Sequence, residues 1–240
     1  MESTGVIFTG LNVAWVCRCW VMSASFDAVI FDFDGVIVDT EWAIYQTWQE
    51  LYVQHGAELS LDVYVQCVGS DHGAWDPKAY LDGLVGKSLD WDGILPAKHA
   101  EARKLLEAEG VMSGVIEWLD DLQGGGIPVG VASSSSVDWV GGWLEKLGLR
   151  ERFVSLSCRD HVERIKPAPD LFLDAARKLG AAPARCLVVE DSFNGMVAAH
   201  AAGMRVLAVP NRITAGQDFS AALMRVESLG DFCFAEIMAS

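Results

Sequence analysis

The sequence predicts an α/β protein in which a doubly wound parallel sheet carries an inserted α-helical domain. Two observations lead to this prediction. Short apolar runs alternate with helix-like stretches through most of the chain, which is the pattern of a parallel sheet covered by helices on both faces. One interval after the first run breaks the alternation, because it shows helical periodicity and no strand of comparable strength.

Five apolar runs bounded by polar or turn residues predict buried strands. They lie at 26–31 (FDAVIF), 127–132 (IPVGVA), 153–157 (FVSLS), 186–189 (CLVV) and 206–209 (VLAV). Between the later runs, helices are predicted at 137–147, 169–179 and 195–202. This alternation favours parallel strands joined by helical crossovers.

The interval from 40 to 110 predicts several helices above the sheet. They cover 41–55, 60–67, 77–84 and 94–108. In the first of them Trp42, Tyr45 and Trp48 recur at helical spacing, and we expect these rings to pack with one another rather than to contact a ligand. An insertion directly after the first strand places a second domain over the carboxyl edge of the sheet, where open α/β sheets bind ligands. The predicted domains are therefore 22–39 with 111–240 for the core, and 40–110 for the helical insertion.

The composition indicates a globular protein with neither a nucleic-acid nor a membrane partner. Of its 240 residues 51% are hydrophobic and 21% charged, and the formal net charge is −15. Nucleic acids and anionic membranes attract basic surfaces, so this acidity argues against both. No apolar stretch reaches the roughly 18 residues of a membrane helix. The six cysteines follow no disulfide or zinc spacing, which predicts reduced thiols in a cytoplasmic protein. Residues 1–21 are expected to be a poorly ordered extension or a mis-assigned start, with a targeting segment as the alternative.

Two acidic pairs close predicted strands. Asp32 and Asp34 follow the first run, with Gly35 allowing a sharp turn after them, and Glu190 and Asp191 follow the fourth. If the two strands are neighbours, these carboxylates meet at one edge, where like charges require a cation. A hard divalent ion with oxygen ligands suits them, and Mg²⁺ is the usual one where phosphate is involved. A solvated acidic turn and a helix cap at Asp191 or Ser192 remain the alternatives.

Two further elements could bind an anion. Ser133 and Ser134 begin a run of four serines after the second strand, and they offer hydroxyl and N–H groups at a helix N-terminus. Lys166 precedes a Pro-x-Pro segment that starts the next helix and could neutralise phosphate and carboxylate charge. The alternatives are an ordinary serine turn and a solvated surface lysine.

These elements, in this order, resemble the four motifs of the haloacid-dehalogenase-like (HAD) superfamily of hydrolases. The motifs are D-x-D-G-V at 32–36, serine at 133, lysine at 166 and E-D-S-x-N-G at 190–195. DGVIVDTE at 34–41 and GVIEWL at 114–119 resemble more closely the branch that holds β-phosphoglucomutase and small sugar-phosphate phosphatases. The resemblance covers 26–209 and implies a Rossmann-like core with a helical cap.

The resemblance also implies a Mg²⁺-dependent phosphatase that hydrolyses small phosphate monoesters through an aspartyl-phosphate. Asp32 would be the nucleophile and Asp34 the general acid and base. The phosphoryl oxygens would be bound by Ser133, the backbone around Ser134, and Lys166. The Mg²⁺ ligands would be Asp32, the backbone carbonyl of Asp34, and Asp191, with Glu190 in support. The expected partner is a small phosphorylated metabolite, and the expected state is a monomer or weak homodimer.

The loop at 69–75 is the candidate for substrate selection. Asp71 and His72 offer polar groups and Trp75 a stacking surface, although Trp75 could instead pack between helices. A phosphosugar mutase is the alternative function. It is disfavoured because Ile44 stands where those mutases have a histidine, and because the loop offers only His72 as a second cationic group. A third hypothesis, a non-catalytic ligand-binding protein, is disfavoured because binding alone needs no nucleophile beside an acid.

Overall fold

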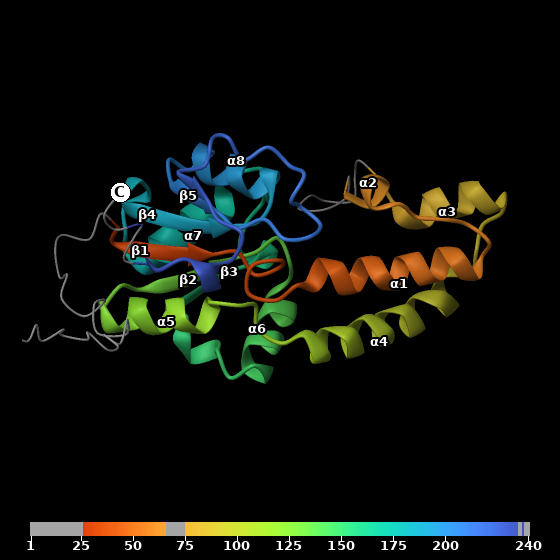
Figure 1. Ribbon diagram of the computed structural model, residues 1–240, viewed down its shortest axis with the longest axis horizontal. Coiled ribbons are helices and arrows are strands. Elements are labelled where there is room, and N and C mark those ends of the chain that lie inside the picture. Colours follow the sequence, from red (N-terminus) through yellow and green to blue (C-terminus); the bar gives the residue numbers. More distant parts are fainter. Residues whose placement is uncertain (1–25, 66–74, 235–236, 238–240) are drawn as a thin grey trace, which may run out of the picture.

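The computed structural model describes residues 26–65, 75–234 and 237, and in this part of the chain six parallel strands form one sheet in the order β3-β2-β1-β4-β5-β6 (Figure 1). The strands are β1 (Ala28–Phe31), β2 (Val129–Ala132), β3 (Ser155–Ser157), β4 (Cys186–Glu190), β5 (Arg205–Ala208) and β6 (Met224–Arg225). The first five follow the predicted runs, and the fold class is confirmed. The strand β6 was not predicted, because two residues without an apolar run leave no periodic signal.

Helices cover both faces of the sheet. On one face α5 (Val115–Gly124) and α6 (Val137–Lys146) pack against strand residues such as Val29. On the other face α7 (Asp170–Leu179) and α8 (Phe193–Ala201) pack against residues such as Ile30. Consecutive side chains of β1 therefore point into the hydrophobic cores on opposite faces of the sheet, because side chains alternate along a strand. Short 3₁₀ helices complete the connections: η3 (Arg150–Arg152), η4 (Arg159–His161), η5 (Pro183–Arg185) and η6 (Leu229–Asp231).

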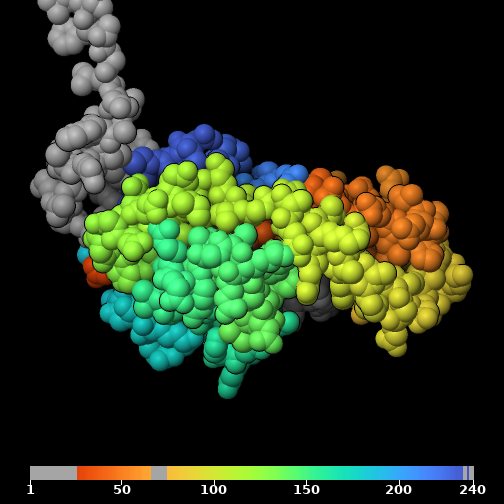
Figure 2. Space-filling view, turned by 90° about the horizontal axis from the view of Figure 1, so that it is seen from below, coloured from red at the N-terminus to blue at the C-terminus, as the bar shows by residue number. Residues whose placement is uncertain are grey.

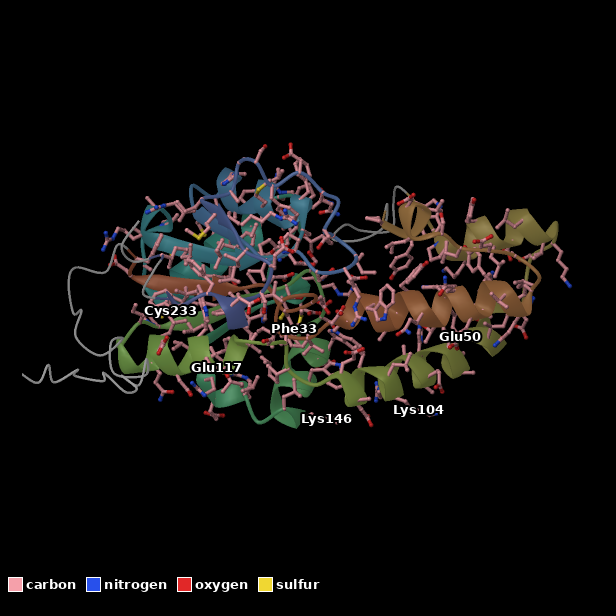
Figure 3. All side chains as sticks on the ribbon, viewed as in Figure 1. Phe33, Glu50, Lys104, Glu117, Lys146 and Cys233 are labelled. Carbon is pink, nitrogen blue, oxygen red and sulfur yellow. The ribbon has the colours of Figure 1, made fainter. Side chains whose placement is uncertain are left out.

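A helical segment lies between β1 and the rest of the sheet in sequence. It contains α1 (Thr40–Gln54), α2 (Leu61–Tyr64), α3 (Pro77–Val85) and α4 (Trp91–Glu109). It extends from the end of the sheet at which β1 leads into α1 (Figures 1 and 2). Phe33 lies where the two parts meet, whereas Glu50 and Lys104 lie along α1 and α4 (Figure 3). The domain boundaries themselves stay a prediction.

The helical segment has an aromatic core of its own. Tyr45, Trp48 and Tyr52 are buried there, and Trp42 packs half-buried against them. None of the described helices is long and apolar enough to cross a bilayer. The extension expected at residues 1–21 lies outside the described residues.

Arg212, in the loop after β5, joins the core to both ends of the helical segment. Its guanidinium pairs with Asp39 before α1 at 2.8 Å and with Glu109 at the end of α4 at 3.5 Å. It also lies 4.5 Å above the ring of Trp42. A planar guanidinium can pair with carboxylates and stack on a ring at the same time. One core residue therefore contacts the chain both where it enters the helical segment and where it leaves it.

Candidate active site

A cavity of about 710 Å³ lies between the carboxyl edge of the sheet and the helical segment. Residues from both parts line it. Those from the core include Asp32, Asp34, Ser134, Lys166 and Asp191, and those from the helical segment include Glu41, Trp48, Tyr64, Lys98 and His99. Five of the site residues predicted from the sequence therefore share one cavity.

The neighbouring positions of β1 and β4 bring the acidic strand ends together. Phe31 pairs with Val189, and the N–H of Asp32 donates to the Val189 carbonyl at 2.9 Å. One carboxylate oxygen each from Asp32, Glu190 and Asp191 then lies within 4.8 Å of the others, and all three residues are buried. Burial, together with the charge of Glu190, raises the pKa of both Asp32 and Asp191 well above the usual range.

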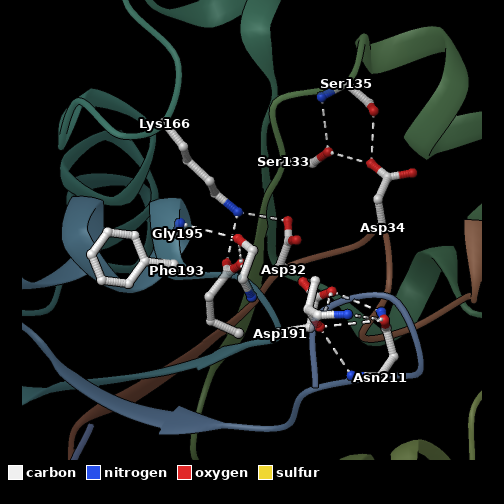
Figure 4. Close-up of polar contacts among 12 residues, drawn as sticks. Asp32, Asp34, Ser133, Ser135, Lys166, Asp191, Phe193, Gly195 and Asn211 are labelled. Carbon is white, nitrogen blue, oxygen red and sulfur yellow. Dashed lines mark hydrogen bonds and ion pairs between the residues drawn. The ribbon is translucent and has the colours of Figure 1, made fainter. Parts of the chain in front are cut away.

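Lys166 supplies the positive charge in this cluster. Its ammonium lies 2.7 Å from Asp32 Oδ1 and 2.9 Å from Glu190 Oε2 (Figure 4). Burial lowers the pKa of Lys166, but the charges of Asp32 and Glu190 and the hydrogen bonds to them have the larger total effect and raise it. With all three acids ionised, one ammonium leaves two negative charges in a buried space, and burial together with this repulsion raises the pKa values of Asp32 and Asp191. Oxygen ligands and this charge deficit fit a divalent cation such as Mg²⁺.

Asp34 is held differently from the other three acids. Its Oδ2 accepts from the hydroxyls of Ser133 at 3.0 Å and Ser135 at 2.7 Å. Its Oδ1 accepts from the Thr40 hydroxyl at 2.8 Å and from the indole N–H of Trp139 at 3.1 Å. The carboxylate points toward the serine turn, whereas Asp32 points toward Lys166 (Figure 4). Its partners on α1 and α6 were not predicted from the sequence.

The serine run forms the turn between β2 and α6. Ser133 is fully buried, and its N–H donates to the carbonyl of Ser157 on β3 at 2.9 Å. Ser136 caps α6, because its hydroxyl accepts from the N–H of Trp139 at 3.3 Å. The hydroxyl of Ser134 is buried without a hydrogen-bond partner among the described residues, although it lines the cavity. An unsatisfied buried hydroxyl beside a cavity is free to bind a ligand.

Asn211 and Thr214, in the loop after β5, complete the acidic side of the site. The side-chain amide of Asn211 donates to Asp191 Oδ2 at 2.8 Å, and the Thr214 hydroxyl lies 3.4 Å from the same oxygen. Gly35 has a φ of 88°, and a Cβ there would overlap both the Asp191 carboxylate and the Asn211 amide. Neither Asn211 nor Thr214 was predicted, although the rule used for the acidic pairs, polar residues after a buried strand, also applies to Asn211.

The helical segment contributes residues other than those predicted. Trp75 packs edge-on against Tyr64, with ring centroids 6.5 Å apart, within the aromatic core of this segment. That is the packing alternative left open by the sequence, and Asp71 and His72 lie outside the described residues. Glu41 and Lys98 line the cavity instead.

Glu41 is half-buried and Lys98 is buried, and the charge of each affects the pKa of the other. Burial and the nearby charge of Asp34 raise the pKa of Glu41 to about 7, although the Tyr64 hydroxyl donates to it at 3.2 Å. Burial lowers the pKa of Lys98 to about 8, and the charge of Glu41 opposes that shift. The Lys98 ammonium lies 4.3 Å from the centre of the Trp48 ring. The part of the cavity wall that the helical segment provides therefore carries charged and aromatic groups.

Buried carboxylates and a lysine at the carboxyl edge of an open parallel sheet define the class of protein: an α/β protein whose charged ligand site lies at the place where such sheets bind ligands. The chain belongs to the haloacid dehalogenase-like hydrolases, whose family pattern matches residues 29–209. The match spans both acidic strand ends, the serine turn and Lys166. It confirms the resemblance found in the sequence.

Known proteins resemble most of the chain. It is 39% identical over 204 residues to YhcW of Bacillus subtilis (strain 168), covering 85% of this chain and 92% of that protein. It is 32% identical over 191 residues to Fructose-1-phosphate phosphatase YqaB of Escherichia coli (strain K12), covering 76% and 96%. A crystal structure of β-phosphoglucomutase from Clostridium difficile matches with a TM-score of 0.70 at 24% identity, covering 89% of this chain and 96% of that one. The last comparison shows the shared fold.

Proposed function

We propose that this protein is a Mg²⁺-dependent phosphatase that hydrolyses small, sugar-phosphate-like monoesters through an aspartyl-phosphate on Asp32. One observation carries the proposal: the buried Asp32 carboxylate pairs with the Lys166 ammonium at 2.7 Å and has an oxygen within 4.8 Å of oxygens of Glu190 and Asp191, beside a cavity of about 710 Å³. The similarity to a fructose-1-phosphate phosphatase supports esters of this size.

In the first step Asp32 attacks the phosphorus atom, so that a carboxylate oxygen–phosphorus bond forms and the ester P–O bond breaks. Lys166 holds Oδ1, and we assign the attack to Oδ2. Asp34 gives its proton to the leaving alkoxide oxygen. In the second step Asp34 accepts a proton from the water that attacks the aspartyl-phosphate, which releases inorganic phosphate and regenerates Asp32.

The phosphoryl oxygens need positive partners, because phosphoryl transfer depends mainly on positioning and charge stabilisation. We assign this binding to the Ser133 hydroxyl, the backbone N–H of Ser134 and the Lys166 ammonium. In the described structure the Ser133 hydroxyl donates to Asp34. A phosphoryl oxygen that takes over this hydroxyl would release one of the hydrogen bonds that keep Asp34 turned toward the serine turn.

We assign Mg²⁺ binding to Asp32, Asp191 and the backbone carbonyl of Asp34. When bound, the ion would offset the excess negative charge of the cluster and polarise the phosphoryl group for attack. Glu190 has a supporting role, since its Oε2 binds Lys166 and its Oε1 accepts from the N–H and hydroxyl of Ser192. Asn211 orients Asp191 in the same way that outer partners orient ligands in other metal sites.

The leaving group would occupy the part of the cavity lined by Glu41, Lys98 and Trp48. A carboxylate, an ammonium and an aromatic ring together suit a polyhydroxylated carbon skeleton, since hydroxyls both donate and accept hydrogen bonds. A mutase remains the alternative function. Ile44 lines the cavity at the position of the mutase histidine, which favours hydrolysis.

The test measures inorganic phosphate release from a panel of phosphate monoesters, with Mg²⁺ and with EDTA. We expect Mg²⁺-dependent release that is lost in Asp32→Asn. A matched control is Asp27→Asn, which removes an exposed carboxylate paired with Arg185 just before the same strand and should leave turnover unchanged. Absence of release from every ester would contradict the proposal. Conversion of a sugar monophosphate to its isomer, activated by the sugar bisphosphate and without net release of inorganic phosphate, would identify a mutase instead.

A further inference from the structure

Trp139 contacts the proposed acid–base residue from a rigid position. It lies in the first turn of α6, where its N–H is capped by Ser136. Its ring packs against Trp143 of the same helix, with centroids 5.9 Å apart. From this position its indole N–H donates to Asp34 Oδ1 at 3.1 Å, and the residue also lines the cavity.

The two oxygens of Asp34 have partners of different kinds. Oδ2 binds only hydroxyls of the serine turn, Ser133 and Ser135, among the described residues. A hydroxyl is both a donor and an acceptor, and it can rotate its proton toward a new acceptor without moving its oxygen. Oδ1 binds Thr40 and the indole of Trp139. An indole N–H is a donor only, in a fixed direction, so it cannot change partners in this way.

Binding of substrate therefore acts on only one of the two oxygens. A phosphoryl oxygen that takes the Ser133 hydroxyl withdraws a partner from Oδ2, whereas the partners of Oδ1 lie outside the proposed phosphoryl-binding set. The Oδ1 anchor also spans both parts of the protein, because Thr40 begins α1 and Trp139 lies on α6.

We infer that Trp139 is a positioning residue: its indole N–H anchors Asp34 Oδ1, so that Oδ2 is the oxygen that passes the proton to the leaving group. This inference rests on the proposed phosphatase function. Without the N–H, Asp34 loses its fixed direction toward the leaving oxygen. The loss should appear only where the leaving group needs a proton.

The test compares kcat/KM of Trp139→Phe for two esters, in the full chain with Mg²⁺. The first ester is an alkyl phosphate that the wild type hydrolyses, whose alkoxide must be protonated as it leaves. The second is p-nitrophenyl phosphate, whose phenolate leaves without a proton. Because kcat/KM covers the steps up to departure of the leaving group, it excludes the later hydrolysis of the aspartyl-phosphate.

We expect kcat/KM for the alkyl ester to fall about tenfold or more, which is part of the roughly 10²–10⁴-fold effect of general acid catalysis. The value for p-nitrophenyl phosphate should change by less than about twofold, because its departure does not depend on Asp34. Equal losses for both esters would overturn the inference, because they would indicate a structural role. No loss for either ester would overturn it as well.

Two further variants guard against a folding artefact. Trp118→Phe is the matched control, since it makes the same ring change and removes an indole N–H that donates to the carbonyl of Phe232, at a buried residue of α5 that does not line the cavity. It should change both esters by the same small factor. Thr40→Val removes the other donor to Oδ1 and should show the same selectivity as Trp139→Phe, with a double variant that is not additive. Additive effects of the two substitutions in the double variant would overturn the inference that Thr40 and Trp139 anchor the same oxygen. A wild type that releases no phosphate from either ester would instead refute the proposed function, so the two failures are distinguishable.

Discussion

Asn211 donates a hydrogen bond from its side-chain amide to Asp191 Oδ2 at 2.8 Å, and both side chains are buried. The Asn211 Oδ1 atom in turn accepts from the backbone N–H of Ile213 at 2.8 Å and of Thr214 at 3.2 Å. The loop after β5 thus holds the amide in one orientation, and the amide holds a carboxylate of the neighbouring strand. An acidic residue fixed in this way is pre-oriented for a metal ion.

We predict that Asn211→Ala weakens Mg²⁺ binding by about 10- to 100-fold, the usual effect of removing a hydrogen-bond partner of a metal ligand. Mg²⁺ titration of phosphate release, together with calorimetric titration of the metal, would measure it. The unfolding midpoint in EDTA serves as the control, since a loss of loop structure alone would lower it. An unchanged Mg²⁺ affinity would contradict the assignment of Asp191 as a ligand oriented by Asn211.

Lys166→Met should destabilise the metal-free protein strongly. The ammonium is buried between Asp32 and Glu190, and removal of one partner of a buried pair costs about 3–5 kcal/mol in free energy of unfolding. Added Mg²⁺ should recover part of this loss, because a cation replaces the missing positive charge. Urea unfolding in EDTA and in Mg²⁺ would test both points.

The matched control for Lys166→Met is Lys146→Met. Lys146 forms a partly exposed pair with Glu107, so its loss should change the unfolding free energy by less than about 1 kcal/mol in either buffer. If Mg²⁺ stabilises neither protein, the ion does not bind beside Asp32; if it stabilises both equally, it does not replace the missing ammonium.

Gly195→Ala should destabilise the fold through a collision with the site. Gly195 lies in α8, and a Cβ there would overlap the carboxylate of Glu190, which is fully buried. We expect a loss of about 1–3 kcal/mol in unfolding free energy, typical of an overpacked core, together with loss of turnover. Gly141 in α6 is the control, because a Cβ there meets nothing within 4 Å. Gly141→Ala should stabilise the protein by about 0.4–1 kcal/mol, and equal effects at the two glycines would refute the collision.

Glu41→Gln should make stability less dependent on pH. The folded-state pKa of Glu41 is raised to about 7 by burial and by Asp34, above its unfolded value near 4.5. The folded state then holds more protons than the unfolded state, so wild-type stability falls as the pH rises through this window. In EDTA the variant and the wild type should have the same free energy of unfolding below the unfolded pKa. At about pH 8 the free energy of unfolding of the variant should be higher by on the order of 2 kcal/mol.

Chemical denaturation at several pH values would measure this difference. Glu50→Gln is the control, because Glu50 is exposed on the same helix (Figure 3), and the change should have little effect at any pH. A stability difference for Glu41→Gln that is the same at low and high pH would show that Glu41 does not carry a buried charge.

The local pattern of the chain was enough to predict five strands and most of the helices, because burial on a strand or a helix face imposes its own period on the sequence. It missed α5, although Val115, Trp118, Leu119 and Leu122 follow the helical period and all four are buried. The proposed site residues of the core could also be identified from the sequence. Asp32, Asp34, Lys166 and Asp191 are charged groups placed where a strand or a turn ends, and they line one cavity.

What the sequence by itself determined about this protein is therefore the kind of sheet, its family and the charged groups of the candidate site. The tertiary structure alone decided how those groups are held. Trp139 reaches Asp34 across 105 positions of sequence, and Asn211 reaches Asp191 across 20. It also placed Trp75 in the aromatic core, and Glu41 and Lys98 along the cavity. The physical reason is that period and turn chemistry act within a few residues, whereas a hydrogen-bond partner on another strand or helix depends on which elements pack together.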